Sequence, residues 1–286
     1  MTEAEDRRIR LIGLDLDGTT LTSDKKLTDH TREVLEACLA GGIQVLPTTG
    51  RTQAAIPDFL KGIKGLRYMI LSNGAKICDL ATGEEIYSDC IPWERALTLA
   101  DELEQYQTYY DFYALGRGWS ERRFFDHLDR FNIEAHIETL VRTSRTPIDD
   151  MRQWIRENQA SIEKFSMFFA SPEHRFSAWE KLKEIPDVLV TSSVPNNLEI
   201  NYHTCNKGNA LLGLGKILGI PREEIMACGD GTNDLAMIKA AGLGVAMENA
   251  DPVVKEAADY ITLSNDEEGV AAAICKFCHL DISIPG

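Results

Sequence analysis

Residues 9–19 of the chain read IRLIGLDLDGT, and this stretch decides the fold. Its first part is an apolar run of strand length, which is typical of a strand buried on both faces of a parallel sheet. Asp15 and Asp17 follow at the strand end, where packing gives no reason for two carboxylates. If the extended geometry persists, their side chains leave the backbone on the same side. Gly18 lets the chain turn sharply and frees backbone N–H groups for an anion.

Strands and helices alternate on both sides of this stretch. Thr28 is expected to cap a helix that ends at Gly41 and Gly42. Strands are expected over residues 43–47, 68–72, 225–228, 243–247 and 260–263. Helices are expected over residues 209–218, 233–241, 252–258 and 267–277. This alternation predicts an α/β fold with a Rossmann-like parallel sheet and right-handed crossovers.

The middle of the chain has a different pattern, richer in aromatic residues and in longer amphipathic segments. Strands are expected over 108–115 and 162–170, and helices over 93–106, 151–157 and 172–184. We therefore predict a core domain formed by residues 1–80 and 193–286, interrupted by an inserted α/β module at residues 81–192.

Composition excludes several classes of protein. The chain has 286 residues and a formal net charge of −15, without a basic stripe for binding nucleic acid. No apolar run approaches the ~18 residues that span a bilayer, and the N-terminus lacks the apolar core of a secretory signal. The seven cysteines are an odd number without a zinc-site spacing, which favours a reducing compartment. We expect a cytoplasmic protein that binds neither membranes nor nucleic acids.

Four short polar stretches each follow a predicted strand or open a predicted helix. They are DLDGT at 15–19, PTTGR at 47–51, KG at 207–208 and GDGTND at 229–234. Ligands bind at the carboxyl edge of open α/β sheets. A Thr hydroxyl before a glycine suits a phosphate oxygen, and hard carboxylate and amide oxygens select Mg²⁺, which binds substrate phosphate. The four stretches together predict a magnesium and phosphate site.

Each stretch taken alone has a plainer interpretation. A DxD pair is usually solvated, Thr49 alone is more often a helix cap, and Lys207 alone is more often a surface charge. The chain has no GxxxxGK[ST] or GxSxG motif, so neither a P-loop nor a serine-hydrolase elbow is available. Four such stretches at one sheet edge favour the functional interpretation.

In this order, the four stretches resemble the motifs of the haloacid dehalogenase superfamily. The flanks SNGA at 72–75 and GVAMENADPVVKEAADYIT at 244–262, with a large insert between the second and third motifs, resemble the Cof-type phosphatases of that superfamily. One departure is Thr20, where a bulky aliphatic residue is more usual. The resemblance implies the superfamily's parallel-sheet core, with the insert as an α/β cap over the active site.

The resemblance also implies roles for the carboxylates. Asp15 would be the nucleophile that takes the phosphoryl group as an aspartyl-phosphate. Asp17 would protonate the leaving oxygen and later deprotonate the hydrolytic water. Mg²⁺ would be held by Asp15, by the backbone carbonyl of Asp17 and by Asp230.

The remaining motif residues would surround the phosphoryl group. Thr49, Gly50 and Lys207 would bind its oxygens, and Asn233 would steady it. Asp234 would orient Lys207 or lie just outside the ligands of the metal.

The insert contains eight arginines and no lysine between Arg117 and Arg156. This cluster could bind an anionic substrate. Seven acidic residues are interspersed among the arginines, however, which favours a solvated, charge-balanced surface.

These observations predict a Mg²⁺-dependent phosphoric monoester hydrolase of small phosphorylated metabolites, sugar phosphates first among them. A phosphomutase on the same core and a non-catalytic regulator that binds phosphorylated metabolites are the alternatives. Analysis of the products would separate hydrolysis from isomerisation. We expect a phosphorylated small molecule as the ligand, and a chain that is a monomer or a homodimer.

Overall fold

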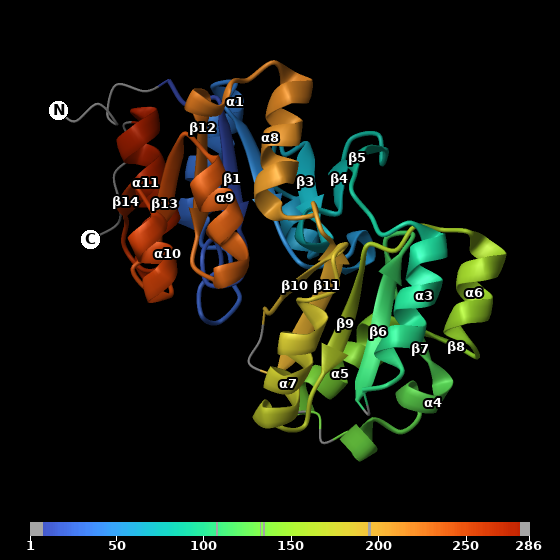
Figure 1. Cartoon of the computed structure of the whole chain (residues 1–286). Helices are drawn as coiled ribbons and strands as arrows, with labels where there is room; N and C mark the ends of the chain where they lie inside the picture. The colour runs from blue at the N-terminus through green and yellow to red at the C-terminus, as the bar shows by residue number, and fades with distance from the viewer. Residues whose placement is uncertain (1–7, 107, 132, 134, 194–195, 281–286) are drawn as a thin grey trace. The chain divides into compact units, whose positions relative to one another are not determined.

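The computed structural model of the chain describes residues 8–106, 108–131, 133, 135–193 and 196–280. The chain forms two compact units, shown in Figure 1. The first comprises Met1–Gly50, Ile56–Ser88 and Asn206–Gly286. The second comprises Arg51–Ala55 and Asp89–Cys205. The expected architecture, a mainly parallel α/β core with a second inserted sheet, is confirmed.

The first unit is built on one sheet, to which eight strands of the described chain belong, in the order β14-β13-β12-β1-β2-β3-β4-β5. Their bounds are β1 (Leu11–Asp15), β2 (Gln44–Thr48), β3 (Tyr68–Leu71), β4 (Lys76–Asp79), β5 (Glu85–Ser88), β12 (Ile225–Gly229), β13 (Leu243–Ala246) and β14 (Tyr260–Ile261). Neighbouring strands are parallel except at β3–β4 and β4–β5. All five residues of β1 are buried, as expected for a central strand covered on both faces.

Helices complete the first unit, and their apolar faces form one core with the sheet. They are α1 (Asp29–Ala40), α2 (Asp58–Lys61), α8 (Lys207–Leu218), α9 (Leu235–Ala240), α10 (Pro252–Ala257) and α11 (Gly269–Cys278). Short 3₁₀ turns are η2 (Ser72–Gly74), η4 (Arg222–Glu224), η5 (Thr232–Asp234) and η6 (Asn265–Glu267). The Thr28 hydroxyl accepts a hydrogen bond from the Thr31 N–H at 3.1 Å, so the expected N-cap of α1 is confirmed.

The second unit contains a mixed sheet of six described strands in the order β10-β11-β9-β6-β7-β8. The strands are β6 (Tyr109–Ala114), β7 (Arg117–Glu121), β8 (Arg145–Ile148), β9 (Lys164–Phe168), β10 (Val188–Thr191) and β11 (Asn197–Tyr202). The helices are α3 (Trp93–Leu103), α4 (Arg122–Phe125), α5 (Ala135–Ser144), α6 (Met151–Asn158) and α7 (Pro172–Leu182), with 3₁₀ turns η1 (Gln53–Ala55) and η3 (Leu128–Phe131). This unit has its own hydrophobic core.

The boundaries of the two units differ from those expected at 81 and 192. Residues 85–88 form β5, which pairs with β4 and so extends the first unit to Ser88. At the other boundary, β11 pairs with β9, which keeps the second unit continuous to Cys205.

Among the described residues, no helix is both long enough and apolar enough to cross a membrane. All seven cysteines lie in the described ranges and are free thiols.

Candidate active site

The strand register brings the ends of three strands together. Asp15, the last residue of β1, lies opposite Thr48 of β2. On the other side of β1, Leu14 lies opposite Cys228 of β12. Residues just beyond these positions therefore meet at one edge of the sheet, and these are Thr49 after β2 and Asp230 after β12. The expected convergence at the carboxyl edge follows directly from this register.

Lys207 reaches the same edge from the start of α8. The Asn206 side chain accepts a hydrogen bond from the Asn209 N–H at 2.8 Å and caps this helix, so Lys207 occupies its first turn. Gly74 of η2 packs against the Asn206 backbone so closely that a Cβ would collide with it. Its φ of +109° also suits glycine. The helix cap and the close packing of Gly74 thus restrict the backbone of Lys207.

The Lys207 ammonium joins two carboxylates. Nζ donates hydrogen bonds to Oδ1 of Asp15 at 2.5 Å and to Oδ1 of Asp234 at 2.6 Å. The side chains of Lys207, Asp15 and Asp234 are 0%, 10% and 2% exposed, so the contacts are shielded from water. Charge-assisted hydrogen bonds of this length are among the stronger ones in proteins.

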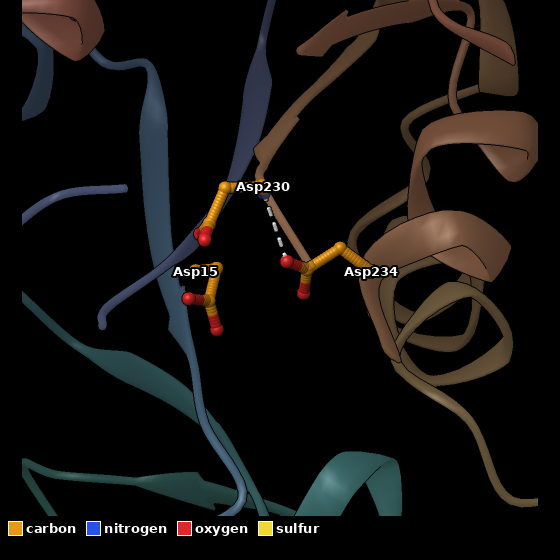
Figure 2. A group of neighbouring side chains, drawn as sticks. All are labelled: Asp15, Asp230 and Asp234. Carbon is orange, nitrogen blue, oxygen red and sulfur yellow. Dashed lines mark hydrogen bonds between the residues drawn. The ribbon is translucent and has the colours of Figure 1, made fainter. Parts of the chain in front are cut away.

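Asp234 is oriented by the backbone of its own turn. Its Oδ2 accepts the N–H groups of Asp230 at 3.1 Å and Gly231 at 3.0 Å. The other oxygen, Oδ1, faces Lys207. In Figure 2 the Asp230 side chain points toward Asp15, and Asp234 lies beside them. This geometry suits Asp234 for holding Lys207 in place.

Asp230 is fixed by a residue of the DLDGT stretch. The Thr19 hydroxyl donates to Oδ1 of Asp230 at 2.6 Å. The carbonyl of Asp230 accepts the Asp251 N–H at 2.9 Å. Gly18 lies so close to the Asp230 carboxylate that a Cβ would collide with it, and its φ is +92°. The DLDGT stretch and the GDGTND stretch are therefore held together by a hydrogen bond and by close packing.

Burial and crowding shift the ionisation of these groups. Burial first, and then the charge of Asp234, raise the pKa of Asp15 to about 8, although Lys207 opposes the shift. Burial, with a smaller contribution from the charge of Asp234, raises the pKa of Asp230 to about 6. Burial lowers the pKa of Lys207, but the charges of Asp15 and Asp234 outweigh it and leave that pKa above its usual value.

The carboxylates form a donor set that fits a hard cation. One oxygen each of Asp15, Asp230 and Asp234 lie within 4.8 Å of one another (Figure 2). Carboxylate oxygens are the ligands that hard divalent cations take. The raised pKa values of Asp15 and Asp230 show that Lys207 alone does not offset the local negative charge and burial. Added positive charge at this point would favour the ionised carboxylates.

Asp17 lies two residues beyond the end of β1. Asp17 forms an isolated β-bridge with Leu21, and Gly18 after it has a φ of +92°. The Asp17 carboxylate forms an ion pair with Lys25 at 3.1 Å, and the Asp17 side chain is 39% exposed. That the Asp15 and Asp17 side chains leave the backbone on the same side stays a prediction.

The remaining predicted residues lie at the same edge. Thr49 is buried, its N–H donates to the Ile70 carbonyl at 3.0 Å, and its carbonyl accepts the Asn73 N–H at 3.1 Å. Gly50 follows it and is half-buried. Asn233 is half-buried in η5, next to Asp234.

Several contributing residues were not singled out as site residues from sequence. Thr19 holds Asp230, and the Thr20 hydroxyl donates to the Asp15 carbonyl at 2.5 Å. Asn206 caps α8. Thr19 lies inside a motif already noted, and Asn before a helix is an ordinary capping signal, so both were within reach of sequence reasoning. The position of Thr20 depends on the loop conformation, which no local pattern encodes.

The arginine cluster of the second unit is largely neutralised. Within the part of the chain that the structure describes, ion pairs with carboxylates of the same unit are formed by Arg122, Arg123, Arg142, Arg145 and Arg152. These pairs favour the charge-balanced interpretation over an anion-binding surface.

The chain is similar in sequence to a family of hydrolases and to bacterial phosphatases. Residues 12–274 match the family described as haloacid dehalogenase-like hydrolase. The 5-amino-6-(5-phospho-D-ribitylamino)uracil phosphatase YcsE of Bacillus subtilis (strain 168) is 31% identical over 275 residues, covering 95% of this chain and 97% of that protein. Phosphatase YwpJ of the same organism is 32% identical over 285 residues, covering 92% and 98%.

Solved structures agree with the sequence comparisons. A haloacid dehalogenase-like hydrolase from B. subtilis superposes with a TM-score of 0.79 at 29% identity, covering 93% of this chain and 99% of that one. One from Bacteroides thetaiotaomicron gives a TM-score of 0.78 at 30% identity, covering 93% and 98%.

Proposed function

The chain belongs to the haloacid dehalogenase-like hydrolases and is a phosphatase of the Cof type. From this membership we propose that it hydrolyses small phosphorylated metabolites in a Mg²⁺-dependent reaction in which Asp15 becomes phosphorylated. The observation that carries the proposal is the pairing of Asp15 with Lys207, both buried, at a sheet edge that also holds Asp230. A buried carboxylate beside a fixed ammonium is suited to attack a phosphate ester whose negative charge needs an adjacent cation.

The proposed reaction has two displacements at phosphorus. In the first, a carboxylate oxygen of Asp15 attacks, the ester bond breaks, and Asp17 gives its proton to the leaving oxygen. In the second, a water molecule attacks the aspartyl-phosphate, and Asp17 takes a proton from that water. Inorganic phosphate leaves and both aspartates return to their starting states. The 39% exposure of Asp17 supports this role, because its carboxyl can exchange protons with solvent and with a leaving group.

Other residues would hold the phosphoryl group in line. Lys207 would bind its oxygens while Asp234 keeps the ammonium oriented, which the 2.6 Å contact between them supports. Thr49 and Gly50 would bind further phosphoryl oxygens from the end of β2, and Asn233 would steady the group from η5. Phosphoryl transfer depends mainly on such positioning and on charge stabilisation.

We assign the metal site to Asp15, the backbone carbonyl of Asp17 and Asp230. A bound Mg²⁺ would supply positive charge that keeps Asp15 ionised and offsets its repulsion with the phosphate. The donor set supports this ion, since it consists of hard oxygens. Asp234 lies in the same cluster but already accepts from Lys207 and two backbone N–H groups, which supports placing it outside the metal ligands.

For the substrate we propose a phosphate ester on a sugar or sugar-alcohol chain. The relative YcsE is named for a phosphoribityl substrate, in which phosphate is carried by a polyol. This relative, 31% identical to the chain, supports a phosphorylated polyol as the class of substrate.

The test is phosphate release from a generic aryl phosphate, followed by a panel of phosphorylated sugars and polyols. We expect activity with Mg²⁺, its loss in EDTA and its return on adding Mg²⁺. Ca²⁺ should not restore it, because calcium takes more ligands at longer distances. Comparable rates with Ca²⁺ would contradict the metal assignment. A chain that releases no phosphate from any ester in Mg²⁺ would contradict the function.

A further inference from the structure

The loop of residues 16–28, called the Asp17 loop below, is tied to two segments more than 200 residues away in the chain. Among the hydrogen bonds to those segments, Asn249 Nδ2 donates to the Gly18 carbonyl at 2.8 Å, Asn265 Nδ2 donates to the Leu21 carbonyl at 2.9 Å, and Ser23 Oγ donates to Asp266 Oδ2 at 2.7 Å. The first of these contacts lies next to Asp17, the proposed acid.

The Asn249 amide has a defined orientation. The backbone N–H of Asn265 donates to Oδ1 of Asn249 at 3.0 Å. Because an amide oxygen only accepts and an amide nitrogen only donates, this contact leaves Nδ2 as the end that faces the Gly18 carbonyl. The Asn265 N–H of η6 therefore orients the Asn249 amide so that its Nδ2 donates to the Gly18 carbonyl.

The turn that carries Asn249 is fixed to the site itself. Two backbone hydrogen bonds tie it to the end of β12 and the residue after it: Met247 N–H to the Gly229 carbonyl at 3.1 Å and Asp251 N–H to the Asp230 carbonyl at 2.9 Å. The Ala250 N–H closes the turn on the Met247 carbonyl at 3.0 Å. Asn249 thus keeps a constant position relative to Asp230, whose carboxylate is a proposed metal ligand.

Gly18 is the point in the Asp17 loop where such a contact matters most. It has no Cβ and a φ of +92°, so its peptide units rotate more readily than those of other residues. The next residue, Thr19, is tied to Asp230 at 2.6 Å, and the preceding one, Asp17, is paired with Lys25 in solvent-accessible surroundings. The hydrogen bond from Asn249 restrains the glycine between them.

We propose that Asn249 is a positioning residue for Asp17: by holding the Gly18 carbonyl it fixes the turn that presents the Asp17 carboxyl to the leaving group. This inference rests on the proposed function, in which Asp17 is the acid. Asn249 touches neither substrate nor metal in this account and acts through the conformation of Gly18.

Two variants of Asn249 test the proposal, with Ser23→Ala as the matched control. Asn249→Ala removes the contact, and Asn249→Asp keeps the acceptor for Asn265 but places a carboxylate against the Gly18 carbonyl. Ser23→Ala also removes one hydrogen bond between the Asp17 loop and the C-terminal segment, at a point farther along the loop from Asp17.

For alkyl phosphates, which need protonation to leave, we expect kcat to fall about tenfold in Asn249→Ala and further in Asn249→Asp. For an aryl phosphate with a good leaving group the fall should be about threefold or less, and KM should change less than about threefold. Ser23→Ala should stay within about twofold of the wild type for both esters. In hydrogen exchange, peptides from residues 16–28 should exchange faster in Asn249→Ala than in the wild type.

Equal losses for good and poor leaving groups would make Asn249 a general structural residue and overturn the proposal. Unchanged hydrogen exchange in the Asp17 loop would overturn it as well. A wild-type chain that hydrolyses no ester overturns the proposed function. An active wild type with unchanged Asn249 variants overturns this inference alone.

Discussion

Nζ of Lys207 lies 2.5 Å from Oδ1 of Asp15, although 192 positions separate the two residues in the chain. Neither group has much access to water, and a buried charge without a partner is costly. Lys207 therefore reduces the cost of ionising Asp15 at this depth without removing it, since the pKa of Asp15 is still raised to about 8 by burial and by the charge of Asp234. At the centre of the site one ammonium serves two buried carboxylates, and removing it would leave both Asp15 and Asp234 without a cation.

Replacing Lys207 by Met should lower both activity and stability. Asp15 and Asp234 would lose their cation, which typically costs about 3–5 kcal/mol for a buried pair. We expect kcat/KM to fall at least about 100-fold and the midpoint of denaturant unfolding to drop. Lys216→Met, an exposed change on the same helix, should alter stability by less than about 0.5 kcal/mol. Equal midpoints for the two variants would contradict a balanced buried pair.

Asp15→Asn should abolish turnover while the protein still folds. Asn has nearly the same size and still offers an oxygen to Lys207, but its amide cannot attack phosphorus. Phosphate release should fall to background, while the circular dichroism spectrum matches that of the wild type. After acid quench, radiolabel from a labelled phosphate ester should remain on the wild-type protein and be absent from the variant. Full activity in Asp15→Asn would exclude the covalent route.

Asp17→Asn should affect proton transfer more than metal binding. We expect a loss of roughly 10²–10⁴-fold in rate, the usual contribution of general acid–base catalysis. The loss in the first displacement should shrink for esters with good leaving groups, which need little protonation. Rapid quench separates formation of the aspartyl-phosphate from its hydrolysis. Weakened Mg²⁺ binding, or an equal loss for every leaving group in the formation step, would indicate that the Asp17 side chain is a ligand.

Arg145→Met should destabilise the second unit. The Arg145 guanidinium donates from Nε to Oδ2 of Asp111 at 2.6 Å, and the two side chains are 4% and 0% exposed. Removing the cation leaves Asp111 buried without its charge partner, which costs about 3–5 kcal/mol. Arg142→Met removes an exposed pair with Glu138 and should cost less than about 0.5 kcal/mol. Equal unfolding midpoints for both variants, measured in urea, would contradict this difference.

The contribution of Glu104 to stability should depend on pH. Hydrogen bonds from Arg123 lower the pKa of Glu104 from 4.5 to about 2, against the opposing effect of partial burial. A carboxyl with a lowered pKa in the folded state stabilises it above the unfolded pKa, and this stabilisation is lost as pH falls from about 4.5 toward 2. Glu104→Gln should therefore be less stable than the wild type at pH 7. Because the Glu104 side chain is exposed, the difference in the free energy of unfolding should be under about 1 kcal/mol. This difference should become smaller at pH 3. If the difference in the free energy of unfolding between the two proteins is the same at pH 7 and pH 3, the ionisation of Glu104 is excluded as its cause.

The parallel core was predictable because its signals are local and strong. β1 is a mostly apolar, fully buried strand, and α1 begins after a Thr cap and ends at Ala40, before Gly41 and Gly42, of which Gly42 has a φ of +86°. β4 and β5 were not anticipated, because β5 is half-exposed and pairs only at the sheet edge. β11 was also missed: the side chains of Glu199 and Asn201 are buried, although their polarity suggests a solvent-facing surface.

The sequence motifs predict the charged residues of the site, but they do not predict the contacts that connect one motif to another segment. Strand ends in a parallel sheet meet at one edge, so the sequence alone predicts that Asp15 and Asp230 lie together. The contact of Asn249 with Gly18 depends on the path of a loop through space, and so does the pairing of Lys25 with Asp17. Neither contact has a sequence period or a propensity that would encode it.

The pairing of β1 with β12 has a consequence for how the protein is made. At about 5–20 residues per second, the ribosome adds Lys207 roughly 10–40 s after Asp15, since 192 positions lie between them. During that time the apolar β1 can pair with β2, but its other edge has no partner until β12 is made. Residues 89–205 are complete earlier and contain their own core. A nascent chain stalled before residue 225 would therefore carry an exposed strand edge, a feature prone to aggregation, and would lack Asp230, Asn233 and Asp234 of the site.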